Sequence, residues 1–481
     1  MSMGAPFGAC YDCFASASYM LEGGLSMKKP VNKTYSLLST LLVFAMTLVA
    51  CGTSNGGDKP EASASAESDK PSATASSEET VTLKFWTWHP SADLYKPVIE
   101  KFEETHPGIK VELTVMESKD FQTKMPLALS TQENLDVVGV QTGAMPKQIQ
   151  ADLLPLEELL SEARPDWQSV ISENSVAQAK SQADNLKFLP MASVGSMVMY
   201  YNKDILDELG LPAPQTYVEW KAVSDKLHKT KSDKLSVAVG GKDAWIMDEL
   251  VWTIAGQQSD LFNQWRYNGK KLDGPEFTQA VAGFQKIFDD GIISKDDVLD
   301  MDYTSSRTAF TSGQAAFFIQ GTWEANLLLE SFRKSNQVDV GDVGVLPIPA
   351  IEANGKPSIR SFIDLGIAIP AHSTHPKEAM QLIDFLVFGE GNDMLASTFA
   401  FSTNKTSFAP DASLLTTPTA QQSYKIVSDL LSFPTADRNN NSPFSDVAGQ
   451  QLQKLLISSQ TPEETAKAIE QEFQTGKYPN E

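Results

Sequence analysis

Along most of this chain, short segments in which apolar and polar residues alternate are separated by segments in which apolar residues recur every three or four positions. Alternation is typical of strands, and the longer spacing is typical of helices with one apolar face. Up to residue 143 the patterns predict strand, helix, strand, helix and strand, an order that indicates a parallel sheet with right-handed crossovers. The predicted strands are 81–90, 109–116 and 134–143, and the predicted helices are 94–108 and 121–132.

The same two patterns continue to the C-terminus, so the chain from residue 81 onwards is predicted to be of the α/β class. Its length corresponds to roughly two domains. Residues 198–231 predict a strand, a helix, a proline-rich turn and a second helix, and residues 314–332 predict a strand, a glycine turn and a helix. Further strands are predicted at 234–241, 343–350 and 362–370, and further helices up to Ile293, over 375–388 and beyond Ser442.

One apolar run does not fit this folded part. Leu37–Ala50 is too short for a membrane span, follows Lys28, Lys29 and Lys33, and stops at Cys51. A basic front, a short apolar middle and small residues at the end are typical of an export signal. The last four positions, "LVAC", resemble the lipobox of bacterial lipoproteins, in which the peptide is cut before the cysteine and the cysteine receives a lipid such as palmitate.

This resemblance makes 27–50 a lipoprotein signal peptide and Cys51 a membrane tether; an ordinary secretory peptide and an uncleaved anchor are the alternatives. Residues 1–26 are interpreted as a non-native or over-extended N-terminus, because a signal must lie near the start of a chain to work. Their "CYDC" motif has redox spacing but lacks a thioredoxin-like context. Residues 51–80 hold the cysteine and a linker rich in Ser, Ala and Glu, which we expect to be a flexible stalk.

Charge and cysteine content narrow the classes of partner. The formal net charge of −22 argues against a nucleic-acid partner. It also argues against an anionic ligand, which the negative protein would repel at long range. With residues 1–50 removed, Cys51 is the one remaining cysteine, so the folded part is expected to rely on core packing rather than on disulfides.

Ligands of α/β sheets bind beyond the carboxyl ends of strands, so the residues at those positions are candidate site residues. Trp86 and Trp88 end the first predicted strand, and Gln141 and Thr142 end the third. Gly321 and Trp323 follow the strand "AAFFIQ", and Asp364 is expected to begin the strand "LGIAIP". These are aromatic platforms and hydrogen-bonding groups, with one carboxylate.

The sequence contains no recognisable motif for catalysis or for metal binding. The five histidines occur in neither a nucleophile-elbow nor a zinc-protease setting, and His372 and His375 lie on the loop before Pro376. The acidic stretch 294–302 lacks the order and the glycine of a calcium loop. We therefore expect no enzyme activity, no cofactor and no metal site.

Five blocks, in order, resemble the bacterial extracellular solute-binding proteins of the sugar-binding, maltose-binding-protein class. They are "LKFWTWHP…HPGIKVEL…LDVVGV", "MYYNKDILDELGLPAPQTYVEWKAVSDKL", "FTSGQAAFFIQGTWEAN", "VGVLPIPA" and "HPKEAMQLIDFLV". The resemblance covers residues 81 to the C-terminus. It implies a two-lobed periplasmic-binding-protein-like fold of type II, each lobe a mostly parallel sheet flanked by helices, with a ligand cleft between the lobes.

The resemblance also implies where the chain passes between lobes. Lobe 1 would comprise 81–190 and 345–397, and lobe 2 would comprise 196–343 and 404–481. The crossovers would lie near 189–196, 344–347 and 397–404.

Within the implied cleft, Trp323 matches the family's stacking tryptophan. We expect one of Trp86 and Trp88 in the cleft and the other in the core, with Trp88 favoured for the cleft. Trp245 and Phe444 fall near further family aromatics. Tyr200 could be a core residue, a hinge residue or a ligand contact. Arg438 could face the cleft or pair with an acidic residue at the surface. Asp364 could bridge two sugar hydroxyls or make a lobe contact. Trp167, Trp220, Trp252 and Trp265 are expected to be packing residues.

The function implied is a lipid-anchored receptor on the extracellular face of the membrane, in a Gram-positive bacterium. It would capture a carbohydrate by lobe closure and deliver it, as a monomer, to the permease of an ABC transporter. The alternatives are a peptide or polyamine ligand on the same fold, presentation of sugar to a sensor kinase and, more distantly, an extracellular glycosidase.

Overall fold

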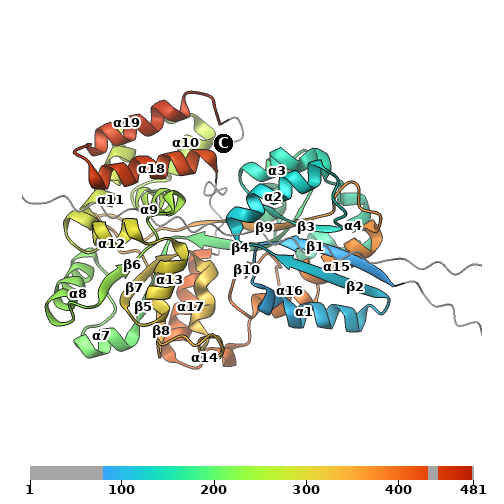
Figure 1. Ribbon diagram of the computed structural model, residues 1–481, viewed down its shortest axis with the longest axis horizontal. Helices are drawn as coiled ribbons and strands as arrows, with labels where there is room; N and C mark the ends of the chain where they lie inside the picture. Colours follow the sequence, from blue (N-terminus) through green and yellow to red (C-terminus); the bar gives the residue numbers. More distant parts are fainter. Residues whose placement is uncertain (1–79, 432–441, 479–481) are drawn as a thin grey trace, which may run out of the picture. The chain divides into compact units, whose positions relative to one another are not determined.

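The computed structural model describes residues 80–431 and 442–478. The predicted Cys51 tether and Arg438 therefore lie outside the described residues. Two sheets, each with its own helices, organise the described part, as the two-lobed prediction requires (Figure 1). We call the six-stranded sheet and its helices the first lobe, and the four-stranded sheet and its helices the second lobe.

The first lobe is built on a sheet with strand order β10-β4-β9-β3-β1-β2. Strand β1 pairs in parallel with β2 and β3, which confirms the predicted strand–helix–strand order. Strand β9 is antiparallel to both of its neighbours, β3 and β4. The strands are β1 (Val81–Thr87), β2 (Ile109–Val115), β3 (Val137–Gln141), β4 (Leu189–Ser196), β9 (Arg360–Ala368) and β10 (Ser402–Thr403).

The second lobe is built on a sheet with strand order β6-β7-β5-β8. Its side chains alternate between two apolar cores: Met199 and Phe317 pack on one face, and Tyr200 and Phe318 on the other. A sheet covered on both faces explains why these strands read as continuous apolar runs. The strands are β5 (Val198–Asn202), β6 (Leu235–Ala238), β7 (Ala315–Gln320) and β8 (Val343–Pro347).

Both sheets are mixed rather than mostly parallel, which corrects the expectation. Of the pairings, β1–β2, β1–β3 and β6–β7 are parallel and the others are antiparallel. The reason lies in the passages between lobes: β4 leads out of the first lobe and β9 leads back into it, so the two neighbours run in opposite directions. The same holds for β5 and β8 in the second lobe.

The passages lie at or after the ends of the expected ranges. The first lies between Ser196 and Val198, close to the range expected. Strand β8 belongs to the second sheet, so the chain returns to the first lobe between Pro347 and Arg360, later than residues 344–347. Strand β10 still pairs in the first sheet, so the third passage lies beyond Thr403.

Local signals account for many helix ends. Thr216 with Glu219 and Thr461 with Glu464 form capping boxes, and Gly210 ends a helix in the left-handed region. The helices of the first lobe are α1 (Ala92–Thr105), α2 (Ser118–Ser130), α3 (Ala144–Ile149), η1 (Gln150–Asp152), α4 (Glu157–Ala163), α5 (Trp167–Val170), α6 (Glu173–Gln182), α15 (Pro376–Val387) and α16 (Glu390–Ala396).

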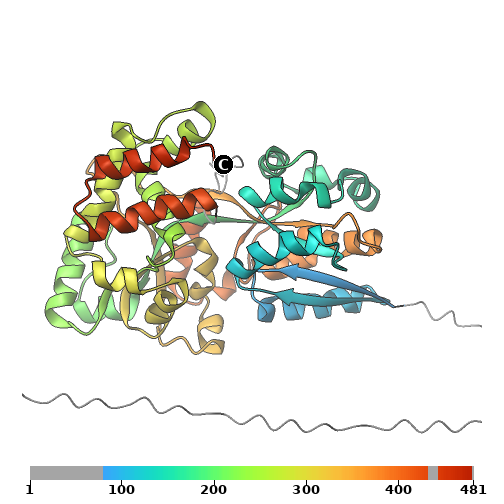
Figure 2. The same ribbon diagram turned by 45° about the horizontal axis from the view of Figure 1, so that its top comes forward.

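In the second lobe, α18 packs against α9 and α19 against α11, and both C-terminal helices are red in Figure 2. Its helices are α7 (Lys203–Leu209), α8 (Tyr217–Thr230), α9 (Ala244–Gly256), α10 (Leu261–Asn268), α11 (Pro275–Asp289), α12 (Lys295–Asp300), α13 (Tyr303–Thr311), η2 (Thr322–Leu328), α14 (Glu330–Ser335), α17 (Pro418–Leu431), α18 (Pro443–Ile457) and α19 (Pro462–Phe473), and η3 (Ala412–Leu414) precedes α17.

Candidate functional site

Two of the predicted tryptophans lie side by side. Trp323, in the first turn of η2, and Trp245, in the first turn of α9, have ring centroids 6.1 Å apart and ring planes inclined by 49°. Trp245 packs against the core of the second lobe, whereas Trp323 packs against the core of the first. Both rings are only partly buried. They therefore form an aromatic surface at the junction of the lobes.

The two residues that precede Trp323 are each held by a hydrogen bond. The hydroxyl of Tyr200 donates to the carbonyl of Gly321 over 2.8 Å, and the N–H of Gly195, at the end of β4, donates to Thr322 Oγ1 over 2.9 Å. Gly321 is required by close approach, because a Cβ there would lie 2.1–2.3 Å from atoms of the Trp323 ring. The indole ring thus folds back over its own turn.

Glu324, directly after Trp323, is 3% exposed, although carboxylates are rarely buried without a partner. Its carboxylate accepts from Arg307 Nε over 2.8 Å and from the hydroxyl of Tyr303. The Glu324 charge, opposed in part by burial, raises the pKa of Arg307. This partly buried ion pair fixes the chain directly after Trp323.

The first lobe contributes Trp86 and Trp88. Trp86 lies in β1 and Trp88 directly follows that strand; both are partly buried and pack against the first-lobe core. The Trp88 ring centroid lies 4.8 Å from that of Phe121, and the ring also lies over Gly139, where a Cβ would come within 3.0 Å of it. Neither tryptophan is a fully buried core residue.

The predicted polar residues meet where β3 ends beside β9. Gln141 pairs in register with Leu365, and the Thr142 N–H donates to the Asp364 carbonyl over 3.3 Å. The Thr142 hydroxyl donates to the Ile363 carbonyl, so it is engaged within the lobe. Gln141 accepts a hydrogen bond of 2.8 Å from Gln122.

Asp364 lies within β9 rather than at the start of a strand, which corrects the expectation. Its strand extends back to Arg360 because residues 360–363 continue the pairing with β4. The side chain is 5% exposed.

Tyr200 and Phe444 lie in the second-lobe cores. Both are 0% exposed, and Phe444 packs among Trp265, Phe473 and Tyr478 at centroid distances of 5.0–5.6 Å. Neither side chain therefore offers a surface to a ligand in this structure, and Tyr200 acts on the site only through its bond to Gly321. The prediction that Trp167, Trp220, Trp252 and Trp265 are packing residues is confirmed, since each is at most 4% exposed.

One face of α9 holds two of the passages between lobes. Glu249, Thr253 and Gln257 are spaced by four residues, as is Trp245 before them, so all share this face. The Glu249 carboxylate accepts from Ser196 Oγ and forms an ion pair with Arg360, while Thr253 Oγ1 accepts from the Met197 N–H over 2.7 Å.

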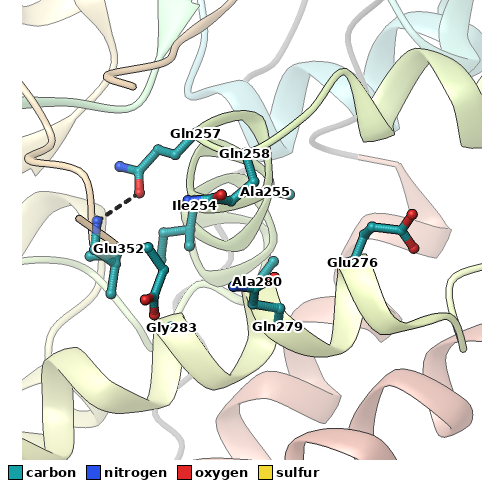
Figure 3. Close-up of a pocket in the computed structure, with 10 residues that line it drawn as sticks. Ile254, Ala255, Gln257, Gln258, Glu276, Gln279, Ala280, Gly283 and Glu352 are labelled. Atoms are coloured by element: carbon teal, nitrogen blue, oxygen red, sulfur yellow. Dashed lines mark hydrogen bonds between the residues drawn. The ribbon is translucent and has the colours of Figure 1, made fainter. Parts of the chain in front are cut away.

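Gln257 secures the second passage. Its Oε1 accepts from the Ile351 N–H over 3.0 Å, the bond drawn in Figure 3, and its Nε2 donates to the carbonyls of Ile348 and Pro349 over 3.2 and 3.3 Å. The pocket in Figure 3 lies between α9, α11 and this passage. It is about three helical turns along α9 from Trp245, so it belongs to the junction and not to the aromatic surface.

The sequence did not reveal the buried charges around the site, which are Glu249, Glu324 and Arg360, or the partly buried Arg307 that pairs with Glu324. A signal was available for Glu249, which stands within the apolar run "AWIMDELVWTIAG". A charged residue in such a run must find a partner when it is buried. Which partner it finds depends on segments more than fifty residues away, as Ser196 and Arg360 are.

The described residues contain no group of three or more His, Cys, Asp or Glu placed to hold a metal ion. His375 Nδ1 instead lies 3.2 Å from Asp136 Oδ1 at the start of α15. In that same part of the chain, no helix combines the length and the apolar character that a membrane span requires.

Comparisons of sequence give distant relatives over most of the chain. An uncharacterised ABC transporter extracellular-binding protein of Pyrococcus horikoshii is 22% identical over 82% of this chain and 89% of its own. The galactooligosaccharide-binding protein of Bacillus subtilis is 25% identical over 74% and 76%. The maltooligosaccharide ABC transporter solute-binding lipoprotein of Streptococcus pneumoniae is 24% identical over 77% and 80%.

Solved structures share the fold. One from work on xylan utilization by Caldanaerobius polysaccharolyticus has a TM-score of 0.69 at 19% identity, covering 82% of this chain and all of its own. A chitin oligosaccharide binding protein has a TM-score of 0.64 at 19% identity, covering 82% and 98%.

The family model for bacterial extracellular solute-binding proteins matches residues 88–392, which is more than half of the chain and includes segments of both lobes. The matched range contains Trp88, Trp245, Trp323 and the first two passages between lobes. The chain therefore belongs to the bacterial extracellular solute-binding protein family.

Proposed function

We propose that this protein binds a carbohydrate, an oligosaccharide rather than a single sugar, between its two lobes. The observation that carries the proposal is the pair of indole rings of Trp245 and Trp323, 6.1 Å apart at the lobe junction. Sugars present apolar C–H faces, which pack on aromatic rings, and a rim of hydroxyls, which need placed polar groups. Two neighbouring platforms suit consecutive sugar rings.

The first lobe would complete the site. Trp88 and Trp86 are partly buried on its sheet, and Gln141, Thr142 and Asp364 gather at the end of β3 and on β9. A carboxylate such as Asp364 can accept hydrogen bonds from two neighbouring hydroxyls, and Gln141 can both donate and accept. Galactooligosaccharide and maltooligosaccharide, the ligands in the names of two relatives, are of this neutral, hydroxyl-rich kind.

Capture would occur by closure of the lobes about the passages anchored on α9. Hinge closure concentrates the backbone change in a few residues between rigid bodies. The face of α9 that holds Ser196, Met197 and the 348–351 segment would act as the fixed side of that hinge. The loaded protein would then meet the permease of an ABC transporter, the transporter class that appears in the names of several relatives. The proposed role includes no catalysis.

We further propose that a lipid on Cys51 holds the receptor, as a monomer, on the extracellular face of the membrane of a Gram-positive bacterium. The support is the signal-like run 37–50 that ends at Cys51 and the Ser/Ala/Glu-rich linker beyond it. A tether keeps the receptor at a high effective concentration near its permease. Replacing Cys51→Ala should release the protein into the medium, and retention of the variant on membranes would refute the tether.

A polyamine or peptide ligand is the second candidate on the same fold. A polyamine needs several free carboxylates around its aromatic box. Next to the tryptophan pair, the Glu324 carboxylate is already engaged by Arg307 and Tyr303, so the surroundings favour a neutral ligand. Presentation of sugar to a sensor kinase would use the same site. A glycosidase would need two carboxylates on either side of the scissile glycosidic bond.

The test is a thermal-shift panel on the mature chain with maltotriose, xylotriose, galactotriose, spermidine and a tripeptide. A ligand at 100 times its Kd should add about 2.7 kcal/mol to the stability. Trp323→Ala should abolish the shift, whereas Tyr267→Ala, an aromatic truncation at a residue that is 56% exposed on α10, should preserve it. A shift with spermidine or the peptide alone would overturn the carbohydrate proposal.

A further inference from the structure

Tyr303, the first residue of α13, connects the two segments that carry the tryptophan pair. Its backbone N–H donates to Asp243 Oδ2 over 2.7 Å, and Asp243 lies two residues before Trp245. Its hydroxyl donates to Glu324 Oε1, and Glu324 directly follows Trp323. One residue thus bonds to the chain beside both rings.

The backbone of Tyr303 is seated closely against the loop that leads into α9. A Cβ at Gly240 in that loop would lie 2.6–2.8 Å from the backbone of Asp302 and Tyr303, which only glycine avoids. The Lys242 N–H also donates to the Met301 carbonyl over 2.9 Å. The start of α13 and the start of α9 are therefore held together along several residues.

The hydroxyl group of Tyr303 binds a carboxylate, Glu324, that also forms an ion pair. Arg307, one turn further along α13, places Nε 2.8 Å from Glu324 Oε2, so α13 contributes both the cation and the phenol that bind this carboxylate. Hydrogen bonds to an ionised acceptor are about twice as strong as those between neutral groups. Burial, together with the Glu324 charge, raises the pKa of Tyr303 well above its usual value, so its hydroxyl stays a donor.

We propose that Tyr303 is a positioning residue that sets the distance and angle between Trp245 and Trp323. The inference rests on the proposed carbohydrate function, because it assigns Tyr303 an effect on affinity without a contact to the ligand. Sites that recognise a ligand by shape must be held to within about 0.5 Å by their supporting residues. Without the phenolic bond, Arg307 alone joins α13 to the Trp323 turn, and the residue bonded to Asp243 no longer reaches Glu324.

The test is the variant Tyr303→Phe, which removes only the hydroxyl. The near-UV circular dichroism of two neighbouring indoles depends on their distance and angle, and the contribution of this pair is identified from the difference between the wild type and Trp323→Phe. In Tyr303→Phe without ligand we expect that contribution to be reduced. By calorimetric titration, the affinity for the trisaccharide that binds the wild type best among maltotriose, xylotriose and galactotriose should fall about tenfold, the scale of one hydrogen bond to a charged group.

The chain offers a matched control in Tyr217→Phe. The Tyr217 hydroxyl donates to Asp290 Oδ2 over 2.7 Å, and Lys286 binds the same carboxylate, so a phenol, an acid and a cation meet there as well. Tyr217→Phe should leave the indole signal and the affinity unchanged. If Tyr303→Phe cannot be prepared folded, Asp243→Asn, which keeps an oxygen acceptor, should preserve the indole signal that Asp243→Ala loses.

An unchanged indole signal in Tyr303→Phe would overturn the proposal, whatever the affinity does. A fall in affinity with an unchanged signal would mean that the hydroxyl acts on the ligand itself. If the wild type binds none of the three trisaccharides, the carbohydrate proposal fails, while the spectra of the unliganded variants still decide whether Tyr303 positions the pair.

Discussion

Arg360 of β9 and Glu249 of α9 form an ion pair across the two lobes, with side chains 5% and 0% exposed. The guanidinium also lies over the Phe262 ring, 4.3 Å from its centroid. Such a pair gains little net free energy over apolar residues, yet losing one partner leaves an uncompensated buried charge.

Replacing Glu249→Ala should therefore lower the free energy of unfolding by about 3–5 kcal/mol. Urea denaturation measures this directly. The control is Lys425→Ala, which breaks the exposed pair with Asp429, whose side chains are 74% and 65% exposed; it should cost at most about 1 kcal/mol. A double variant Glu249→Leu/Arg360→Met should recover most of the loss, and a cost as small as the control's would contradict the buried pair.

A second prediction concerns Gly321. The Cβ of Gly321→Ala would lie 2.1–2.3 Å from the Trp323 ring, so the indole must move. We expect ligand affinity to fall by tenfold or more while the protein remains folded, measured by titration calorimetry and circular dichroism. Gly274→Ala is the control, because its Cβ would meet no atom closer than 3.6 Å; wild-type affinity in both variants would show that the ring position is irrelevant.

A third prediction concerns the second passage between lobes. Gln257→Ala removes the three hydrogen bonds to Ile348, Pro349 and Ile351 and should destabilise the protein by about 1–3 kcal/mol. Because the passage is then less constrained, small-angle scattering should show a larger difference between the free and ligand-bound protein. Gln471→Ala, at an exposed position of α19, should behave as wild type in both measurements; equal effects of the two variants would contradict the anchor.

The fourth prediction is a pH dependence at Asp290. The hydrogen bond from Lys286, and after it that from Tyr217, lowers the pKa of Asp290 from its ordinary value of 3.8. Because the folded pKa lies below the unfolded one, the stabilisation is present above pH 3.8 and is lost as the pH falls through the folded pKa. The stability difference between wild type and Asp290→Asn, measured by urea denaturation, should shrink as the pH is lowered from 6 to 3. A difference that stays constant over this range would exclude the linkage.

Local pattern predicted much of the fold. The strands at 81–87, 109–115 and 315–320 and the helices around 94–105 and 376–387 were expected in these places, since alternation, helical spacing and proline at a helix start act within a few residues. The burial of Trp220 and Trp252 was also anticipated. Trp252 lies in a strongly apolar helix, and Trp220 lies on the apolar face of an amphipathic one.

Other features depended on contacts between distant segments. The direction of β9 and the membership of β8 in the second sheet follow from the order in which the chain passes between lobes, and a strand's own residues do not encode its neighbours. The same holds for Phe444, which the family resemblance placed near the ligand and which packing places in the core.

The sequence by itself determined the elements, the family and the small set of tryptophans from which the site could be drawn. Only the tertiary structure decided that Trp245 and Trp323, 78 positions apart, lie 6.1 Å from each other, and that Tyr303 bonds to the segments of both. The physical reason is range: secondary structure depends on backbone preference and periodicity over a few residues, whereas a binding surface is assembled by close packing of segments that meet only after the whole chain has folded.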